Sequence, residues 1–221
     1  MSTAFLGNPL IAELLDDPAR FKQEGHAYQL LEEYFSGFPV ETLRPLMRHE
    51  NGLVRHAALW VASELGEQAC VLLGDAIPLI ASDDRFESYH ALEIAAVCAV
   101  GDQVERFVAV VAGLESSDGV IRGLTMRLMS RADAAQLRAA AAAAVGDTRL
   151  AEVHKRGLEL LAIGDTVDPN AIKRFLTSED GVARSYGAIA AKRLSNKYPE
   201  LLEVAASLPD TSVSKFAGDA A

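Results

Sequence analysis

Apolar and polar positions along this chain follow a helical period and repeat at intervals of about 32 residues. In each clear copy an apolar helix end is followed by a short polar turn, and a new helix then opens with an apolar residue and Arg. Clear copies span 45–55, 113–122 and 175–184, and weaker copies span 79–88 and 146–154. No stretch shows the sustained two-residue alternation of a strand. The pattern predicts an all-α chain of about five helical hairpins.

Alignment of the five copies on the Arg position reveals two further repeated positions. The Arg position is occupied by Arg55, Ser88, Arg122, His154 and Arg184. Three residues later a small side chain stands in Ala58, Ala91, Thr125, Gly157 and Gly187, and six residues later an apolar one stands in Val61, Ile94, Leu128, Leu160 and Ala190. A small residue one turn into a helix, followed by a bulky one, suits two helices that approach closely.

Less regular segments flank the repeat and are predicted to cap it. Residues 9–38 hold two short amphipathic stretches, from Pro9 to Leu15 and from His26 to Phe35. The second of these places Tyr28, Leu31 and Phe35 on its apolar face. We therefore predict a single domain over 1–208. Its expected parts are an N-terminal helical cap (1–40), the repeats (41–198) and a C-terminal cap helix (199–208), with a frayed tail (209–221).

This arrangement resembles the HEAT-repeat family over roughly residues 41–198. The matching features are the Asp or Asn turn, the Val-Arg or Ile-Arg pair that opens the second helix, the small residue after it, and Leu65-Gly66 at its end. Ser88 and His154 depart from the family Arg, which leaves the boundaries of the second and fourth repeats open. The resemblance implies a right-handed α-solenoid whose groove, built from successive second helices, binds proteins or peptides.

Sequence patterns that carry catalysis or hold metal ions are largely missing. The chain has no Gly-rich phosphate loop, no Gly-x-Ser-x-Gly elbow and no His-Glu-x-x-His motif. Its densest ligand-like group is Asp83, Asp84, Glu87 and His90, interpreted as an acidic helix start, with a weak cation site as the alternative. We therefore predict a protein that is not an enzyme and has no catalytic residue, cofactor or metal.

Candidate partner-binding residues lie off the predicted core of the second helices. In helix 54–65 the core stripe is Val54, Ala58, Val61 and Leu65. Positions off this stripe, taken through the repeats, give a row that mixes aromatic and charged side chains: His56, Trp60, Tyr89, Glu93, Arg127 and Lys155. Trp, Tyr and Arg are enriched at binding hot spots. The alternatives are that Trp60 and Tyr89 pack against a neighbouring unit or cap, and that the charged members are merely solvated.

The chain is acidic, and the acidity is uneven. Its 221 residues carry 31 acidic and 21 basic side chains, a net charge of −10. Residues 1–100 hold 15 acidic and 6 basic side chains, whereas residues 101–221 hold 16 and 15. This charge disfavours binding to nucleic acid or anionic lipid and favours a basic protein partner, with ordinary solubility as the alternative explanation. Nucleic-acid binding by the near-neutral second half, around Arg122, Arg127, Arg131 and Arg138, is a third possibility.

Other features suggest a cytoplasmic protein that is monomeric when free. The first residues lack a basic segment followed by a long apolar one, and no uniformly apolar run reaches 18 residues. Cys70 and Cys98 lie in apolar helical surroundings and are expected to be reduced core residues. A resemblance to bacterial HEAT-repeat immunity proteins implies a toxin or effector as the partner. The alternative is an accessory subunit or lyase-like HEAT protein that acts in an enzyme complex.

Overall fold

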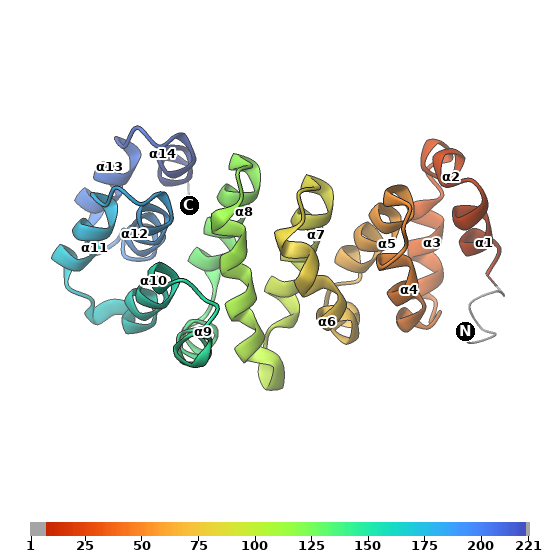
Figure 1. Ribbon diagram of the computed structural model, residues 1–221, viewed down its shortest axis with the longest axis horizontal. Helices are drawn as coiled ribbons and strands as arrows, with labels where there is room; N and C mark the ends of the chain where they lie inside the picture. Colours follow the sequence, from red (N-terminus) through yellow and green to blue (C-terminus); the bar gives the residue numbers. More distant parts are fainter. Residues whose placement is uncertain (1–7, 220–221) are drawn as a thin grey trace. The chain divides into compact units, whose positions relative to one another are not determined.

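The computed structural model describes residues 8–219, which form helices joined by short turns with no strand among them (Figure 1). The prediction of an all-α chain is confirmed. The chain divides into two compact units, unit 1 (residues 1–98) and unit 2 (residues 99–221). The continuous right-handed solenoid stays a prediction. Residues 1–7 of the expected N-terminal cap and 220–221 of the expected tail lie outside the described residues.

Unit 1 opens with three short helices where two were expected. They are α1 (Pro9–Asp16), α2 (Pro18–Glu24) and α3 (Ala27–Phe35). Helix α2 was missed because it is only seven residues long, but its signals are clear. Asp17 accepts a hydrogen bond from the Arg20 backbone, Pro18 follows it, and Gly25 ends the helix at a φ of 72°.

Helix α3 does not pack through its predicted apolar face. Leu30, Leu31 and Tyr34 are buried, whereas Tyr28 is 68% exposed and Phe35 is 56% exposed. Of the three predicted residues only Leu31 packs inward, so this prediction is wrong for Tyr28 and Phe35. The Tyr34 hydroxyl forms a 2.8 Å hydrogen bond with the hydroxyl of Thr42, which satisfies its polar end while the ring is buried.

The rest of unit 1 holds two long helices that follow the repeated turns. In chain order the elements are η2 (Val40–Thr42), α4 (Leu43–Met47), α5 (Gly52–Glu64), η3 (Gly66–Leu72), α6 (Leu73–Ala76), η4 (Ile77–Ala81) and α7 (Arg85–Cys98), where η marks a 3₁₀ helix. Helix α5 packs against α3, α4 and α7. Its predicted core stripe is confirmed, because Val54, Ala58, Val61 and Leu65 are all buried.

A disulfide joins Cys70 of η3 to Cys98, the last residue of α7, with their Cα atoms 4.9 Å apart. The prediction of two reduced cysteines is therefore wrong. Contacts between α7 and η3 bring together residues 28 positions apart in sequence, which their spacing alone did not indicate. Disulfides persist mainly in oxidising compartments, so the cysteines no longer support a cytoplasmic address.

Unit 2 continues with helices and ends in one that was not expected. Its elements are η5 (Gly101–Glu115), α8 (Gly119–Arg131), α9 (Ala134–Gly146), α10 (Glu152–Ile163), η6 (Gly164–Thr166), α11 (Pro169–Leu176), α12 (Gly181–Arg193), α13 (Pro199–Ala206) and α14 (Thr211–Gly218). The predicted fraying is wrong for α14, which packs on α8 and α13 and buries Val213 and Phe216. Asp210 caps this helix through the backbone N–H groups of Ser212 and Val213.

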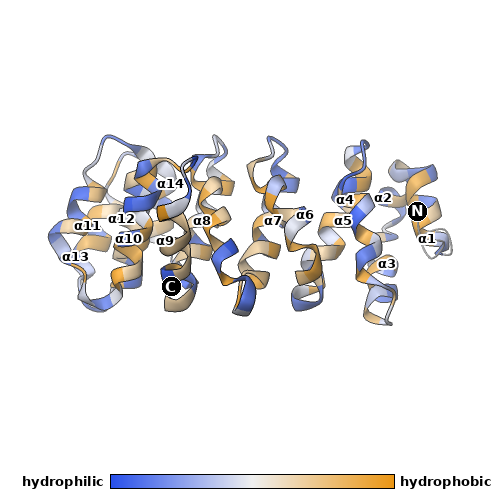
Figure 2. Cartoon of the chain, turned by 60° about the horizontal axis from the view of Figure 1, so that its bottom comes forward, coloured by the Kyte–Doolittle hydropathy of each residue, from blue (hydrophilic) through white to orange (hydrophobic). Residues whose placement is uncertain are grey.

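The repeated polar turns share one local structure. The side chains of Asn51, Asp118 and Asp180 accept hydrogen bonds of 2.7–2.9 Å from the backbone two residues later, and so cap α5, α8 and α12. An Asx side chain before Gly is thus a helix N-cap in each clear copy. Figure 2 shows hydrophilic residues gathered at the turns between helices and hydrophobic residues along the helices.

The repeated Arg has a structural role beside these caps. Arg55 donates to the carbonyl oxygens of His49 and Glu50, and Arg184 donates equivalently to those of Ser178 and Glu179. These carbonyl oxygens lie just after the end of a helix, where no N–H group of the helix is available to bond them. The repeated Arg therefore joins the end of one helix to the start of the next.

The small repeat positions lie where helices approach closely. All five are buried, and in unit 2 a Cβ atom built on Gly157 would lie 2.3 Å from the ring of Tyr186. A Cβ atom on Gly187 would lie 2.7 Å from the backbone nitrogen of Leu176. Real Cβ atoms essentially never come so close, so a larger residue at either position would force its neighbours to move. Within residues 8–219, no helix combines the length and the apolar character needed to cross a membrane.

Candidate functional site

An open pocket in unit 1 is lined by five rings from four helices. Phe21 comes from α2, Tyr28 from the start of α3, His56 and Trp60 from α5, and Phe86 from the first turn of α7. Its volume is about 260 Å³, with Leu53, Ala57 and Pro18 adding to the apolar walls. It therefore unites the N-terminal cap with the second helices of two successive repeats of unit 1.

The rings of this pocket, hereafter the aromatic pocket, pack in two pairs. The rings of Tyr28 and Trp60 meet edge to face with centroids 4.8 Å apart, and those of His56 and Phe86 stack at 4.6 Å. Tyr28 is 68% exposed and Phe86 is 36% exposed, while Trp60 is half-buried. The alternative prediction, that Trp60 packs against the N-terminal cap, is confirmed in part, because Trp60 contacts Tyr28 of the cap but stays half-buried. Exposed aromatic surface on a fixed frame can be buried further by a ligand.

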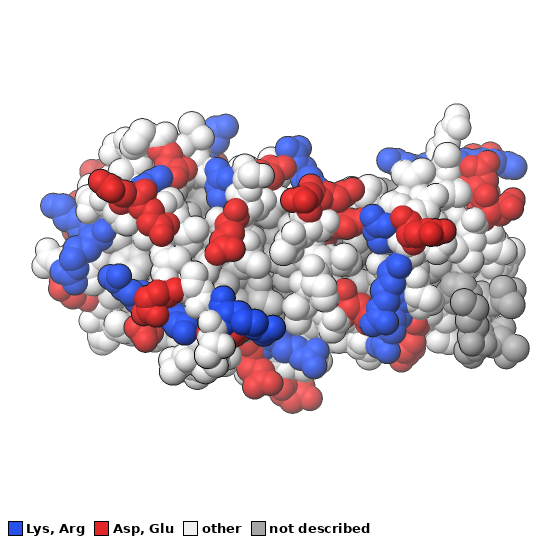
Figure 3. All heavy atoms as spheres, viewed as in Figure 1, with Lys and Arg blue, Asp and Glu red and all other residues white. Residues whose placement is uncertain are grey.

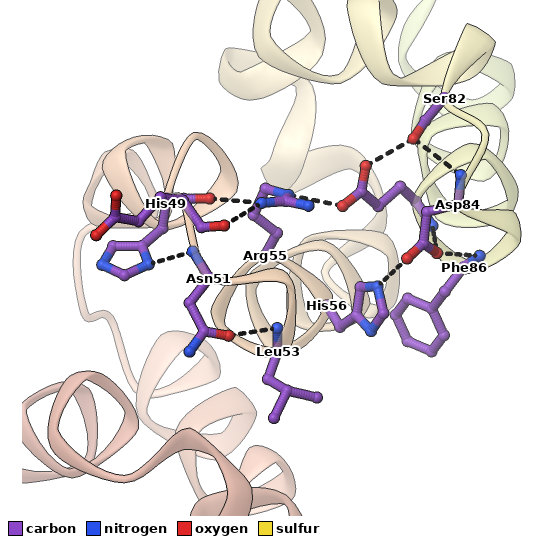
Figure 4. Close-up of polar contacts among 10 residues, drawn as sticks. His49, Asn51, Leu53, Arg55, His56, Ser82, Asp84 and Phe86 are labelled. Carbon is purple, nitrogen blue, oxygen red and sulfur yellow. Dashed lines mark hydrogen bonds and ion pairs between the residues drawn. The ribbon is translucent and has the colours of Figure 1, made fainter.

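Arg55 and Glu87 hold α5 and α7 together beside the pocket (Figure 4). The Arg55 Nε atom lies 2.6 Å from Glu87 Oε1, and the hydroxyl of Ser82 donates to the other oxygen at 2.8 Å. Glu87 is only 4% exposed, and these two donors compensate for the burial of its charge. The pair is a structural clamp that fixes the helices carrying His56 and Phe86.

Asp84 does not itself line the pocket, but it is bonded to His56, which does (Figure 4). Asp84 Oδ2 lies 2.8 Å from His56 Nε2, and Oδ1 accepts from the backbone N–H groups of Phe86 and Glu87. Partial burial opposes the charged form of Asp84, but the hydrogen bonds from His56 and the backbone outweigh it and lower the pKa of this carboxyl. Asp84 is therefore an anion at neutral pH, and its side chain is 40% exposed.

The ligand-like group of Asp83, Asp84, Glu87 and His90 does not assemble as one site. The His90 Nδ1 atom lies 2.9 Å from the hydroxyl of Ser63 and 3.2 Å from Glu93 Oε2, while Asp84 caps α7 and Glu87 binds Arg55. Instead, side-chain ligand atoms of His56, Asp84 and Glu87 lie within 4.8 Å of one another. Arg55 and Ser82 already satisfy Glu87, so this cluster is accounted for by the clamp and the helix cap.

The predicted row of binding residues is divided between the two units. His56 and Trp60 line the aromatic pocket. Tyr89 and Glu93 gather around His90, with the Tyr89 and His90 rings 5.2 Å apart. His90 in turn lies 4.3 Å from the ring of Phe86 and so continues the line of rings along α7.

The two remaining members of the row lie in unit 2. Arg127 on α8 lies 3.9 Å from a carboxylate oxygen of Asp219, and Lys155 is half-buried on α10. Their part in a common binding row with the unit 1 residues stays a prediction.

A buried polar network in unit 2 has a structural explanation. His154, at the repeat's Arg position, lies 3.0 Å from both the hydroxyl of Tyr186 and Glu115 Oε1. Burial, and secondarily the charge of Glu115, raises the pKa of Tyr186 well above its ordinary value. Tyr186 also fills the space beside Gly157, so His154 contacts a core side chain, whereas Arg55 and Arg184 at the same repeat position contact backbone carbonyls.

The two units differ in net charge, because the boundary between them lies close to residue 100, where the acidic half of the sequence ends. Unit 1 carries 15 acidic and 6 basic side chains, a net charge of −9, whereas unit 2 carries 16 and 15, a net charge of −1. On the face drawn in Figure 3, acidic and basic side chains are interspersed over each unit. The acidic excess of unit 1 therefore forms no single patch on that face.

Sequence reasoning found His56 and Trp60 but missed Tyr28, Phe86 and Asp84 as members of the site. The sequence pattern puts Tyr28 on a packing face, and it interprets Asp84 as part of an acidic helix start, with a weak cation site as the alternative. The signal available was the density of aromatic residues near the first two repeats. Searches of family models and of curated proteins with this chain find no match.

Proposed function

We propose that this chain is a HEAT-like protein-binding module without catalytic activity, and that unit 1 carries its binding face. The observation that carries the proposal is the aromatic pocket, with Tyr28 and Phe86 exposed and Trp60 half-buried beside them. Burial of apolar surface contributes roughly 25 cal/mol per Å², so a partner that covers these rings gains affinity. The disulfide, together with the clamp of Arg55 and Glu87, pre-organises this surface.

The charge of unit 1 supports a basic partner. A net charge of −9 attracts a cationic protein at long range and speeds its association at low salt. The acidic groups of unit 1 include Asp84, which is bonded to the lining residue His56, and the exposed Asp83 that precedes it in the sequence. We therefore expect affinity that falls as salt is added, together with an apolar contribution that salt does not remove.

The concrete form of this proposal is that the chain binds and neutralises a basic toxin or effector. The resemblance to HEAT-repeat immunity proteins and the acidic, aromatic surface of unit 1 support it together. Neutralisation needs only tight, specific docking over a functional surface, which fits a chain with rigid helices and no catalytic motif in its sequence.

Affinity capture from the cells that produce the chain tests the proposal. The baits are the wild-type chain, Tyr28→Ala, which removes a pocket ring that is 68% exposed, and Ile163→Ala, which removes a 53% exposed apolar side chain from unit 2. We expect wild type and Ile163→Ala to retain the same basic protein, and Tyr28→Ala to retain at least several-fold less. Absence of any retained protein, or equal retention by all three baits, would contradict the proposal.

A further inference from the structure

We infer that the aromatic pocket takes the side chain of an arginine from the basic partner. This inference deepens the proposed function and rests on it. It follows from two features: π-faces on the walls of the pocket, and a carboxylate bonded to two of the residues that line it.

The walls provide the faces that a guanidinium group prefers. Trp60, Tyr28 and Phe86 come from three different helices and surround a volume of about 260 Å³, enough for one long side chain. Guanidinium groups stack on aromatic rings, most favourably on Trp, and the aliphatic stem of Arg packs against apolar walls. Leu53 and Pro18 offer such walls.

A carboxylate bonded to two lining residues provides the negative charge. Asp84 bonds to His56 and to the backbone of Phe86, and both of these residues line the pocket. Its carboxylate uses part of its acceptor capacity in these bonds, and its side chain is 40% exposed. The Asp84 carboxylate therefore adds negative charge next to the lining residues His56 and Phe86, and it still has room for a further donor.

Arginine fits this combination better than the other candidate side chains. Lysine carries a compact, strongly hydrated charge and loses more solvation on an aromatic surface. A leucine would fill the apolar walls but leave Asp84 unused. Lys22 is the one Lys or Arg among the lining residues, and it is exposed on a flexible stem, while the net charge of unit 1 is −9.

Nuclear magnetic resonance of the full chain tests this inference directly. Trp60 is the only Trp in the sequence, so its indole N–H gives a single resonance at the pocket. The probes are the N-acetyl methylamides of arginine, lysine and leucine. We expect a saturable shift of the indole resonance with the arginine probe, weaker binding of the lysine probe, and the weakest binding of the leucine probe.

A matched pair of variants separates the carboxylate from folding effects. Asp84→Asn removes the charge but keeps a side chain that caps helices well, and Asp180→Asn makes the same change at the equivalent cap of α12 in unit 2. We expect the arginine probe to bind Asp84→Asn about three- to fivefold more weakly and Asp180→Asn as well as wild type.

Three results would overturn the inference: no shift with the arginine probe, leucine binding as tightly as arginine, or unchanged arginine binding in Asp84→Asn. The outcome is separate from that of the capture experiment. If Tyr28→Ala loses the partner while the arginine probe fails to bind, the proposed function stands and the arginine inference falls. If the probe binds but wild type retains no protein, the proposed function falls while the arginine preference of the pocket stands.

Discussion

Units 1 and 2 use the same helix caps and the same Arg contacts, yet they place their aromatic rings differently. In unit 1, Tyr28 and Phe86 are exposed around a pocket, whereas in unit 2 Phe107, Tyr186 and Phe216 are buried and Phe175 is half-buried. The large apolar side chains that unit 2 exposes, within the described residues, are aliphatic. The two units therefore share caps and Arg contacts, and the residues between these repeated positions decide which unit presents exposed aromatic rings.

The units also differ in the contacts that join helices within each of them. In unit 2, two of the repeated Arg residues form hydrogen bonds with the start of helix α14. Arg122 donates to the hydroxyl of Ser212, and Arg184 donates to the carboxylate of Asp210. In unit 1 a disulfide joins η3 to the end of α7. The disulfide leaves the opposite end of α7, where Phe86 and Asp84 lie, available for the pocket.

Of the changes that test this difference between the units, loss of the disulfide is expected to lower stability most. Replacement of both cysteines, Cys70→Ser with Cys98→Ser, should lower the free energy of unfolding by about 3 kcal/mol, because the crosslink closes a loop of 28 residues. Chemical denaturation followed by Trp60 fluorescence reports on unit 1. Reductant should lower the stability of wild type and leave the double variant unchanged; a wild type that does not respond to reductant would contradict the role given to the bond.

The close packing of Gly157 against Tyr186 in unit 2 gives the next largest expected effect on stability. Gly157→Ala should destabilise the protein by roughly 1–3 kcal/mol, because the new Cβ atom meets the fully buried ring of Tyr186. The control is Gly123→Ala on α8, where the nearest atom is the end of the Arg127 side chain at 3.8 Å. This control should be neutral or stabilising, and similar losses in the two variants would show that the packing is not the cause.

A smaller loss is expected at the cap of α14. Asp210→Ala should destabilise unit 2 by roughly 1 kcal/mol, because it removes both the N-cap of α14 and the carboxylate that Arg184 contacts at 3.0 Å. Asp210→Asn keeps the cap and should cost less. Thermal unfolding of the three proteins ranks them, and equal melting temperatures would mean that α14 contributes little to unit 2.

The smallest effect concerns acid sensitivity in unit 1. The pKa of Asp84 is lowered in the folded chain, so its contribution to stability is complete above the ordinary Asp pKa of about 4 and is lost as pH falls through the lower folded value. The stability difference between wild type and Asp84→Asn should therefore shrink below about pH 4. Urea denaturation at neutral and at acidic pH measures it, and a difference that grows on acidification has the wrong sign for this account.

Local signals explain what the sequence predicted correctly. Asn51, Asp118 and Asp180 before Gly mark helix starts because the cap bonds join residues two apart in the chain. The small position was also visible, since Gly157 and Gly187 recur at the spacing of the repeat. Such features need only neighbouring residues or a fixed period.

The remaining features depend on contacts between distant residues. Cys70 meets Cys98 only because η3 packs on α7, and the exposure of Tyr28 follows from which face of α3 is covered by later helices. Helix α14 is short, and burial of Val213 and Phe216 against other helices stabilises it. The pocket likewise combines Phe21 and Phe86, which are 65 positions apart in the sequence.

Site-specific photo-crosslinking tests the claim that unit 1 presents the binding face. A photoreactive benzoylphenylalanine replaces either Tyr28, at the aromatic pocket, or Ile163, an exposed apolar residue of unit 2. After illumination in the producing cells, crosslinked products are identified by mass spectrometry. The account predicts a crosslink to a basic protein from the position of Tyr28 and none from that of Ile163. A crosslink from Ile163 alone would place the binding face on unit 2 and contradict it.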